Sequence, residues 1–81
     1  MGWAMALIRS FKESRMDRNS VHDAVEATYT TFERDGRKFI QVASYGRAER
    51  KFPGTTSQTI QLDERSAREL FGILRTFFNF R

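Results

Sequence analysis

The sequence predicts an α+β fold in which a four-stranded antiparallel β-meander is followed by one C-terminal amphipathic helix, in the order ββββα. Two observations support this fold class. Runs that alternate between apolar and polar residues, rich in β-branched and aromatic types, are separated by turns that contain glycine. The last part of the chain instead repeats its apolar residues with the period of a helix. A chain of 81 residues forms one domain with a thin core.

The first part of the chain differs in composition from the remainder. It begins with a short apolar stretch and continues from Lys12 to Ser20 as a polar, turn-rich segment. We expect residues 1–20 to form a basic arm that is flexible or contains a short helix over residues 3–11, and residues 21–81 to form the single folded domain. Such an arm either frays in solvent or contacts a polyanion.

Residues 25–34 and 37–45 alternate in the manner of two strands, with Asp35-Gly36 between them. A type I′ turn needs two residues that tolerate positive φ, so Asp-Gly in this position predicts a β-hairpin with a two-residue loop. Residues 47–52 and 58–62 are the predicted third and fourth strands. The dipeptide Pro53-Gly54 is a typical turn between them.

The register of the hairpin decides which side chains share a face of the sheet. A two-residue loop pairs Phe32 with Phe39 and Arg34 with Arg37, and opposed residues lie on one face. The other face is then aliphatic and can pack on the helix. A three-residue loop with a bulge at Gly36 would slip the register and move Phe32 into the core.

Asp63 is a suitable N-cap for a helix, because its carboxylate can accept the free amides of the first turn. The apolar residues that follow fall on one stripe, which widens at its end because Phe77 and Phe78 lie about 100° apart. More rings gather there than one side of a lone helix can bury. The predicted dimer interface consists of Phe71, Leu74, Phe77 and Phe78; the alternative is that these rings cover the sheet.

Composition limits the chemistry that this chain can perform. It has no cysteine and a single histidine, His22. Thiolate metal sites, disulfides and a histidine-based triad are therefore excluded within one chain. We expect no metal, no cofactor and no enzymatic activity, and the lack of cysteine suits the cytoplasm. No apolar run approaches the ~20 residues that a membrane span requires.

The basic residues outnumber the acidic ones by 14 to 10, for a net charge of +4. Most of them are arginines, whose planar guanidinium suits phosphate recognition. On the first hairpin they lie among aromatic rings, a combination that single-stranded nucleic acid needs for its bases and its backbone. The candidate nucleic-acid-binding residues are Phe32, Arg34, Arg37, Lys38, Phe39, Tyr45, Arg47 and Lys51.

Three stretches support a comparison with a known family: Gly36-Arg37-Lys38 followed by the alternating Phe39–Val42 and Tyr45, the turn Pro53-Gly54, and Ile60-Gln61-Leu62-Asp63 with Leu70 on the helix. Over residues 25–78 the chain resembles the single-stranded-DNA-binding domain of the transcriptional positive cofactor four family. The resemblance implies four antiparallel strands, a helix and a dimer. It also implies DNA contacts from Arg37, Tyr45 and Lys51.

Two functional hypotheses follow from the sequence. The first is a homodimeric protein that binds single-stranded DNA and works as a transcription or replication accessory factor. The alternative is a protein-interaction module, such as a small phage-like inhibitor or an assembly subunit, that uses the same aromatic face on a protein partner.

Overall fold

The computed structural model describes residues 4–44 and 58–81. They form one four-stranded sheet, in the order β1-β4-β3-β2, and a single C-terminal helix. The α+β fold class is therefore confirmed. The predicted strand 47–52 lies outside the described residues. The elements are β1 (Ala4–Ile8), β2 (Ala27–Arg34), β3 (Arg37–Ser44), β4 (Gln58–Leu62) and α1 (Glu64–Phe78).

Strand β1 corrects the prediction for the start of the chain. Residues Ala4–Ile8 form an edge strand parallel to β4, with Ala6 opposite Ile60, rather than a flexible segment or a helix. The sheet is consequently mixed and not an antiparallel meander. A short apolar run shows no periodicity that distinguishes a strand from a buried helix. Because the partner strand β4 also lies far along the chain, the local sequence pattern could not reveal this pairing.

The β2–β3 hairpin has the register that the two-residue loop predicts. Phe32 lies opposite Phe39 and Arg34 opposite Arg37. Asp35 has a φ of 55° and Gly36 a φ of 76°, as a tight hairpin turn of this type requires. The bulged alternative is therefore wrong.

This register gives the sheet two distinct faces. We call one the ring face and the other the aliphatic face. The ring face is formed in part by β2, β3 and β4. Its residues on these strands include Thr30, Phe32, Arg34, Arg37, Phe39, Gln41 and Gln61. The aliphatic face contains Ala6, Ile8, Ile40, Val42, Ile60 and Leu62.

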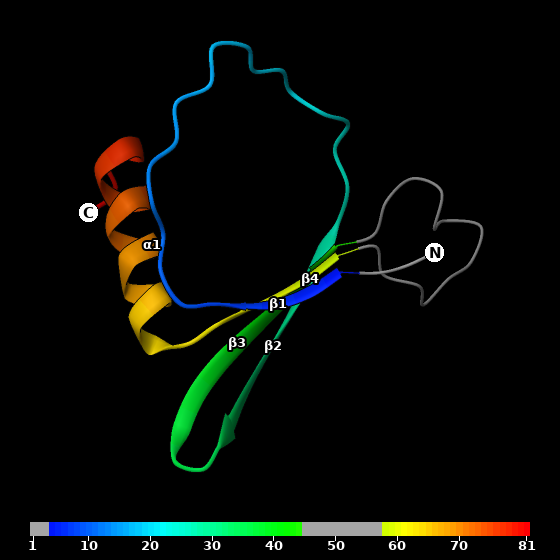
Figure 1. Ribbon diagram of the computed structural model, residues 1–81, viewed down its shortest axis with the longest axis vertical. Helices are drawn as coiled ribbons and strands as arrows, with labels where there is room; N and C mark the ends of the chain where they lie inside the picture. The colour runs from blue at the N-terminus through cyan, green and yellow to red at the C-terminus, as the bar shows by residue number, and fades with distance from the viewer. Residues whose placement is uncertain (1–3, 45–57) are drawn as a thin grey trace, which may run out of the picture.

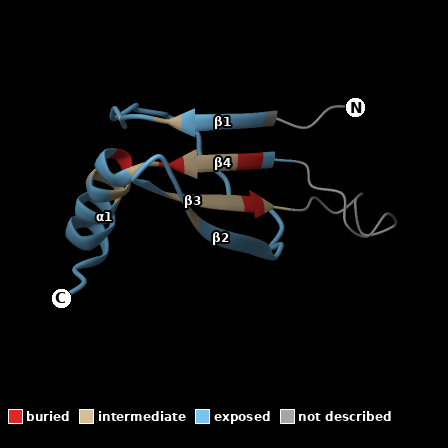
Figure 2. Cartoon of the chain, turned by 90° about the horizontal axis from the view of Figure 1, so that it is seen from below, coloured by how far each residue is buried: buried red, intermediate tan, exposed pale blue. Residues whose placement is uncertain are grey.

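The hydrophobic core of the described residues is small. Only Leu62 on the aliphatic face and Ala43 on the ring face are buried hydrophobic side chains there, and the other residues of the aliphatic face are half-buried or exposed (Figure 2). The chain exposes 7759 Å² of surface. A compact protein of 9.5 kDa is expected to expose about 5,000 Å². Large hydrophobic side chains that remain exposed in the single chain include Met5, Val21, Phe71, Phe77 and Phe80.

Helix α1 packs on the sheet only through its first turns. Figure 1 views the sheet edge-on, with the helix and residues 9–26 on the same side of it. Ser66 is buried and Leu70 is half-buried, but the exposed fraction is 61% for Phe71, 80% for Phe77 and 58% for Phe78. The alternative that these rings cover the sheet is therefore wrong. Within the described residues, no helix is long and apolar enough to cross a membrane.

The two described glycines, Gly36 in the hairpin turn and Gly72 in α1, should respond to alanine in opposite directions. Gly36→Ala is expected to destabilise the protein by about 1–2 kcal/mol, because an L side chain is strained at a φ of 76°. Gly72→Ala is expected to stabilise it by about 1 kcal/mol, because Gly72 lies inside α1 and an added Cβ meets no atom within 4 Å. Urea denaturation of both variants measures the two effects. Equal effects would contradict the turn geometry.

Candidate nucleic-acid interface

A pair of aromatic rings forms the centre of the candidate site. The rings of Phe32 and Phe39 are stacked, with centroids 5.3 Å apart and planes inclined by 22°. Both side chains are half-buried, because each ring covers part of the other. They occupy opposed strand positions on the ring face and line a groove between the hairpin tip and the first turn of α1. A further planar group could enter this groove and stack on the rings.

Guanidinium groups border the platform at the hairpin turn. The Cζ of Arg37 lies 5.1 Å from the centroid of the Phe39 ring, in cation–π geometry. Its side chain remains 56% exposed. Arg34 is the strand partner of Arg37 and is exposed as well. A phosphate beside a base stacked on the rings could therefore meet two cations.

Of the other predicted residues, the structure describes only Lys38 and places it on the other face of the hairpin. Lys38 is opposite Glu33 and belongs to the aliphatic side of the hairpin. The remaining three predicted residues, Tyr45, Arg47 and Lys51, lie outside the described residues. The structure therefore brings together Phe32, Phe39, Arg34 and Arg37.

A polar pair that the sequence did not single out extends the ring face toward β4. Gln61 Nε2 donates to Gln41 Oε1 at 2.9 Å, and the two residues are strand partners. Both side chains are half-buried. Amides of this kind retain free donors and acceptors that suit the edge of a nucleobase. The register of β3 against β4 is the signal that could have identified this pair, because it places Gln41 opposite Gln61 on the ring face.

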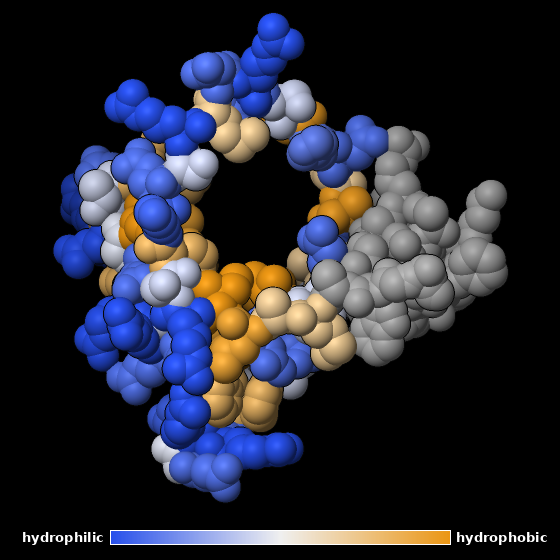
Figure 3. Space-filling view, in the orientation of Figure 1, coloured by the Kyte–Doolittle hydropathy of each residue, from blue (hydrophilic) through white to orange (hydrophobic). Residues whose placement is uncertain are grey.

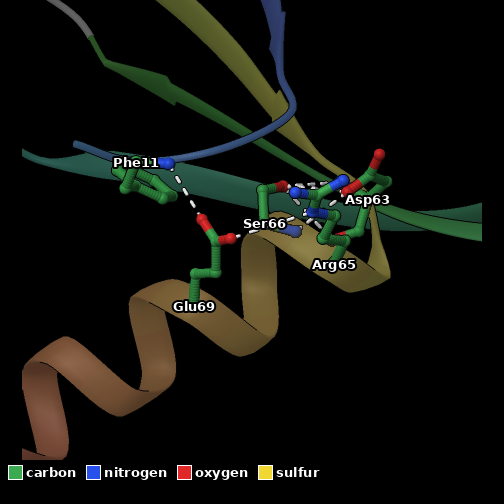
Figure 4. A network of polar contacts seen from close by, with 5 residues as sticks. All are labelled: Phe11, Asp63, Arg65, Ser66 and Glu69. Atoms are coloured by element: carbon green, nitrogen blue, oxygen red, sulfur yellow. Dashed lines mark hydrogen bonds and ion pairs between the residues drawn. The ribbon is translucent and has the colours of Figure 1, made fainter.

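The N-terminus of α1 is fixed by a reciprocal cap. Ser66 N–H donates to Asp63 Oδ1 at 2.9 Å, and Asp63 N–H donates to Ser66 Oγ at 3.0 Å (Figure 4). Ser66 is completely buried. The hydrogen bond from the Ser66 backbone N–H is the main cause that lowers the pKa of the Asp63 carboxyl below its usual value, with further contributions from the Ser66 side chain and Arg37. This cap confirms the predicted start of the helix.

An ion pair connects the hairpin to that cap. Arg37 Nη2 lies 3.7 Å from Asp63 Oδ2. Because Asp63 already accepts the Ser66 amide, its carboxylate is held in one place and in turn restrains the Arg37 side chain. Sequence reasoning identified both residues but assigned them to separate roles. Their sequence separation gives no signal of the contact.

A groove of about 870 Å³ lies between the hairpin tip and the first turn of α1. The charged residues along it are balanced in number, since Glu33, Asp63 and Glu64 oppose Arg37, Lys38 and Arg65. Glu64 comes from α1, Asp63 from its N-cap, and Glu33 from the aliphatic side of the hairpin. Phe32, Phe39 and Arg37 of the ring face also line the groove, so a ligand stacked on the rings meets cations at the turn and carboxylates at the start of α1.

Comparison of the chain with protein-family models, with curated proteins and with solved structures finds no match. The geometry of the hairpin and its neighbours is therefore the basis for assigning a function.

Removing the Asp63 carboxylate should lower stability in a pH-dependent manner. A carboxyl group whose pKa is lowered by folding stabilises the native state above its unfolded value of 3.8, and this contribution disappears as the pH falls through the folded value. We expect Asp63→Ala to lower the thermal midpoint at neutral pH and the difference from the wild type to shrink toward about pH 2.

Asp17→Ala is the matched control, because Asp17 is an exposed aspartate in residues 9–26. Its thermal midpoint should follow that of the wild type at each pH. A difference between Asp63→Ala and wild type that stays constant in acid would contradict the assigned role of the ionised carboxylate.

Proposed function

We propose that this protein binds single-stranded nucleic acid, with DNA favoured, as a non-enzymatic transcription or replication accessory factor in the cytoplasm. The stacked pair of Phe32 and Phe39, with Arg37 over one ring, is the observation that carries the proposal. Bases of a single strand can reach such a platform, whereas those of a duplex are already stacked on each other.

The composition of the ring face supports this assignment. The described strand positions on that face include arginine, glutamine, threonine and phenylalanine, and none of them is Asp or Glu. A phosphate backbone that runs along it avoids the repulsion that Glu33 would exert on the opposite face. The strand positions of the ring face therefore suit a polyanion better than the start of α1, where Asp63 and Glu64 lie.

The expected affinity is moderate and comes mainly from stacking. Each base stacked on an aromatic ring contributes about 1–3 kcal/mol. The cations at the turn are few, and Asp63 partly neutralises Arg37. The resemblance to the positive cofactor four family implies the same ligand class, and the family's expected contacts from Tyr45 and Lys51 would add to those described here.

A homodimer is the proposed assembled form. The predicted interface residues of α1 are exposed apolar side chains with few contacts to their own sheet. Such surface on a basic protein is stable in solution when another molecule covers it. A second copy presents the same surface and closes the assembly by a two-fold axis.

Binding to a single-stranded oligonucleotide should depend on both the rings and the arginines. For two or three neutralised phosphates, the logarithm of the affinity should fall with the logarithm of the salt concentration with a slope of about −2. Phe39→Leu keeps an apolar side chain but removes the ring, and should cost about 1–3 kcal/mol of binding. Arg34→Glu combined with Arg37→Glu should abolish binding. Fluorescence anisotropy titrations measure each quantity.

Arg68→Glu combined with Arg75→Glu is the charge-matched control, because both arginines are exposed on α1. It should retain most of the affinity. If the control and the hairpin variant lose equal affinity, binding is due to net charge and the assigned site is wrong. Absence of binding at low salt would favour a protein partner for the ring face.

Disruption of the helix stripe should produce a monomer. Phe77 is 80% exposed, so Phe77→Asp removes no core contact of the single chain. We expect light scattering to give twice the 9.5 kDa mass for the wild type and the single mass for this variant. Thr76→Asp, on the opposite side of the helix, should remain dimeric. A monomeric wild type at high concentration would refute the dimer.

A further inference from the structure

The aliphatic face of the sheet is only partly covered. Leu62 is buried beside the start of α1, whereas Ile8, Ile40 and Ile60 remain half-buried. The space-filling view shows an opening bounded by this part of the sheet, the helix and residues 9–26, with hydrophobic side chains along its sheet side (Figure 3). A stable protein rarely leaves such a surface in contact with water.

Residues 9–26, the connecting segment, form the outer border of this opening. They contain no helix or strand and run around the opening at a distance from the sheet (Figure 1). Phe11 N–H donates to Glu69 Oε1 at 2.9 Å and joins the start of the segment to α1. Farther along, Met16 and Val25 are exposed and Val21 is 100% exposed. The segment thus offers apolar side chains that no other described part of the single chain covers.

The helix of the same chain cannot fill the opening. α1 begins one residue after β4, and the Asp63–Ser66 cap together with the Arg37 ion pair fixes its direction. Its C-terminal half consequently leaves the sheet, and its rings pack mainly on each other: Phe77 and Phe78 meet edge to face with centroids 5.1 Å apart. Each chain thus has an opening with an apolar sheet side, and an apolar helix end that cannot fill this opening.

We propose that the opening is the seat for the C-terminal half of α1 from a second copy of this chain, so that two copies exchange helix ends reciprocally. The inference rests on the proposed homodimer and specifies how it assembles. The aromatic helix end of one copy packs on the aliphatic face of the other, and the connecting segment wraps around it.

Two magnitudes support a reciprocal seat. The chain exposes 7759 Å², roughly 2,700 Å² above the expectation for a compact monomer of its mass. Obligate dimers bury about 2,000–5,000 Å² in total, or about 1,000–2,500 Å² per copy, so an interface of this kind can account for most of the excess on one chain. Residues 9–26 also reach about 60 Å when extended. A helix about 11 Å across has a girth of about 35 Å, which a segment of that length can surround.

Cysteine cross-linking tests the seat directly, because the described chain and its full sequence contain no cysteine. Val21→Cys and Phe77→Cys are prepared as separate proteins, mixed, allowed to exchange subunits and oxidised. Both positions are highly exposed, so neither variant disturbs the core of a single chain. Since each protein carries one thiol, a disulfide between the two variants joins two copies.

We expect the Val21→Cys and Phe77→Cys mixture to form a covalent heterodimer, resolved by mass spectrometry. Thiols held side by side in a dimer have an effective concentration of about 1 mM. At a micromolar protein concentration, the rate of disulfide formation should therefore exceed that of the control mixture by about 100-fold. The control mixture pairs Phe77→Cys with Thr28→Cys, an exposed ring-face position on the other side of the sheet.

The outcomes separate the seat from the dimer itself. A heterodisulfide well above the control supports the reciprocal seat. If light scattering gives the dimeric mass but the disulfides formed are mainly between two Phe77→Cys chains, the two helices pack directly on each other. That result would overturn the proposed seat and leave the homodimer intact. A monomeric wild type would overturn both. Equal cross-linking of the Val21→Cys and Thr28→Cys mixtures would also overturn the seat, because it would indicate random encounter.

Discussion

The two-residue turn at Asp35-Gly36 is the constraint on which the rest of the structure depends. Both residues adopt positive φ, and the turn sets the register of β2 against β3. A slip by one residue would exchange the two faces of the sheet. With the observed register, Phe32 and Phe39 stack on one face while the aliphatic side chains gather on the other. The candidate binding surface and the apolar packing surface are therefore set by the same turn.

The Asp63 cap relates these two surfaces to the helix. Its carboxylate holds the first turn of α1 through Ser66 and contacts Arg37 of the hairpin. One side chain thus helps to direct the helix away from the sheet and to orient a cation beside the Phe39 ring. This arrangement couples the geometry of the proposed nucleic-acid site to the direction in which α1 presents its aromatic end.

Small size is the physical reason behind the proposed dimer. Only two hydrophobic side chains are buried among the described residues, which is a meagre core for a chain whose ordering costs about 1–2 kcal/mol per residue. Covering the aliphatic face and the rings of α1 would add the missing burial at about 25 cal/mol per Å². Association and folding are then linked, because the same apolar surface serves both.

Local sequence determined the hairpin, its register, strand β4 and the capped helix, because turn chemistry, alternation and helical period act between near neighbours. It also placed Phe32, Phe39, Arg34 and Arg37 in one cluster. Tertiary structure alone decided that Ala4–Ile8 pairs in parallel with β4, that Arg37 meets Asp63, and that the rings of α1 remain uncovered. These features arise between segments far apart in the chain, where no local period or turn preference specifies the partner.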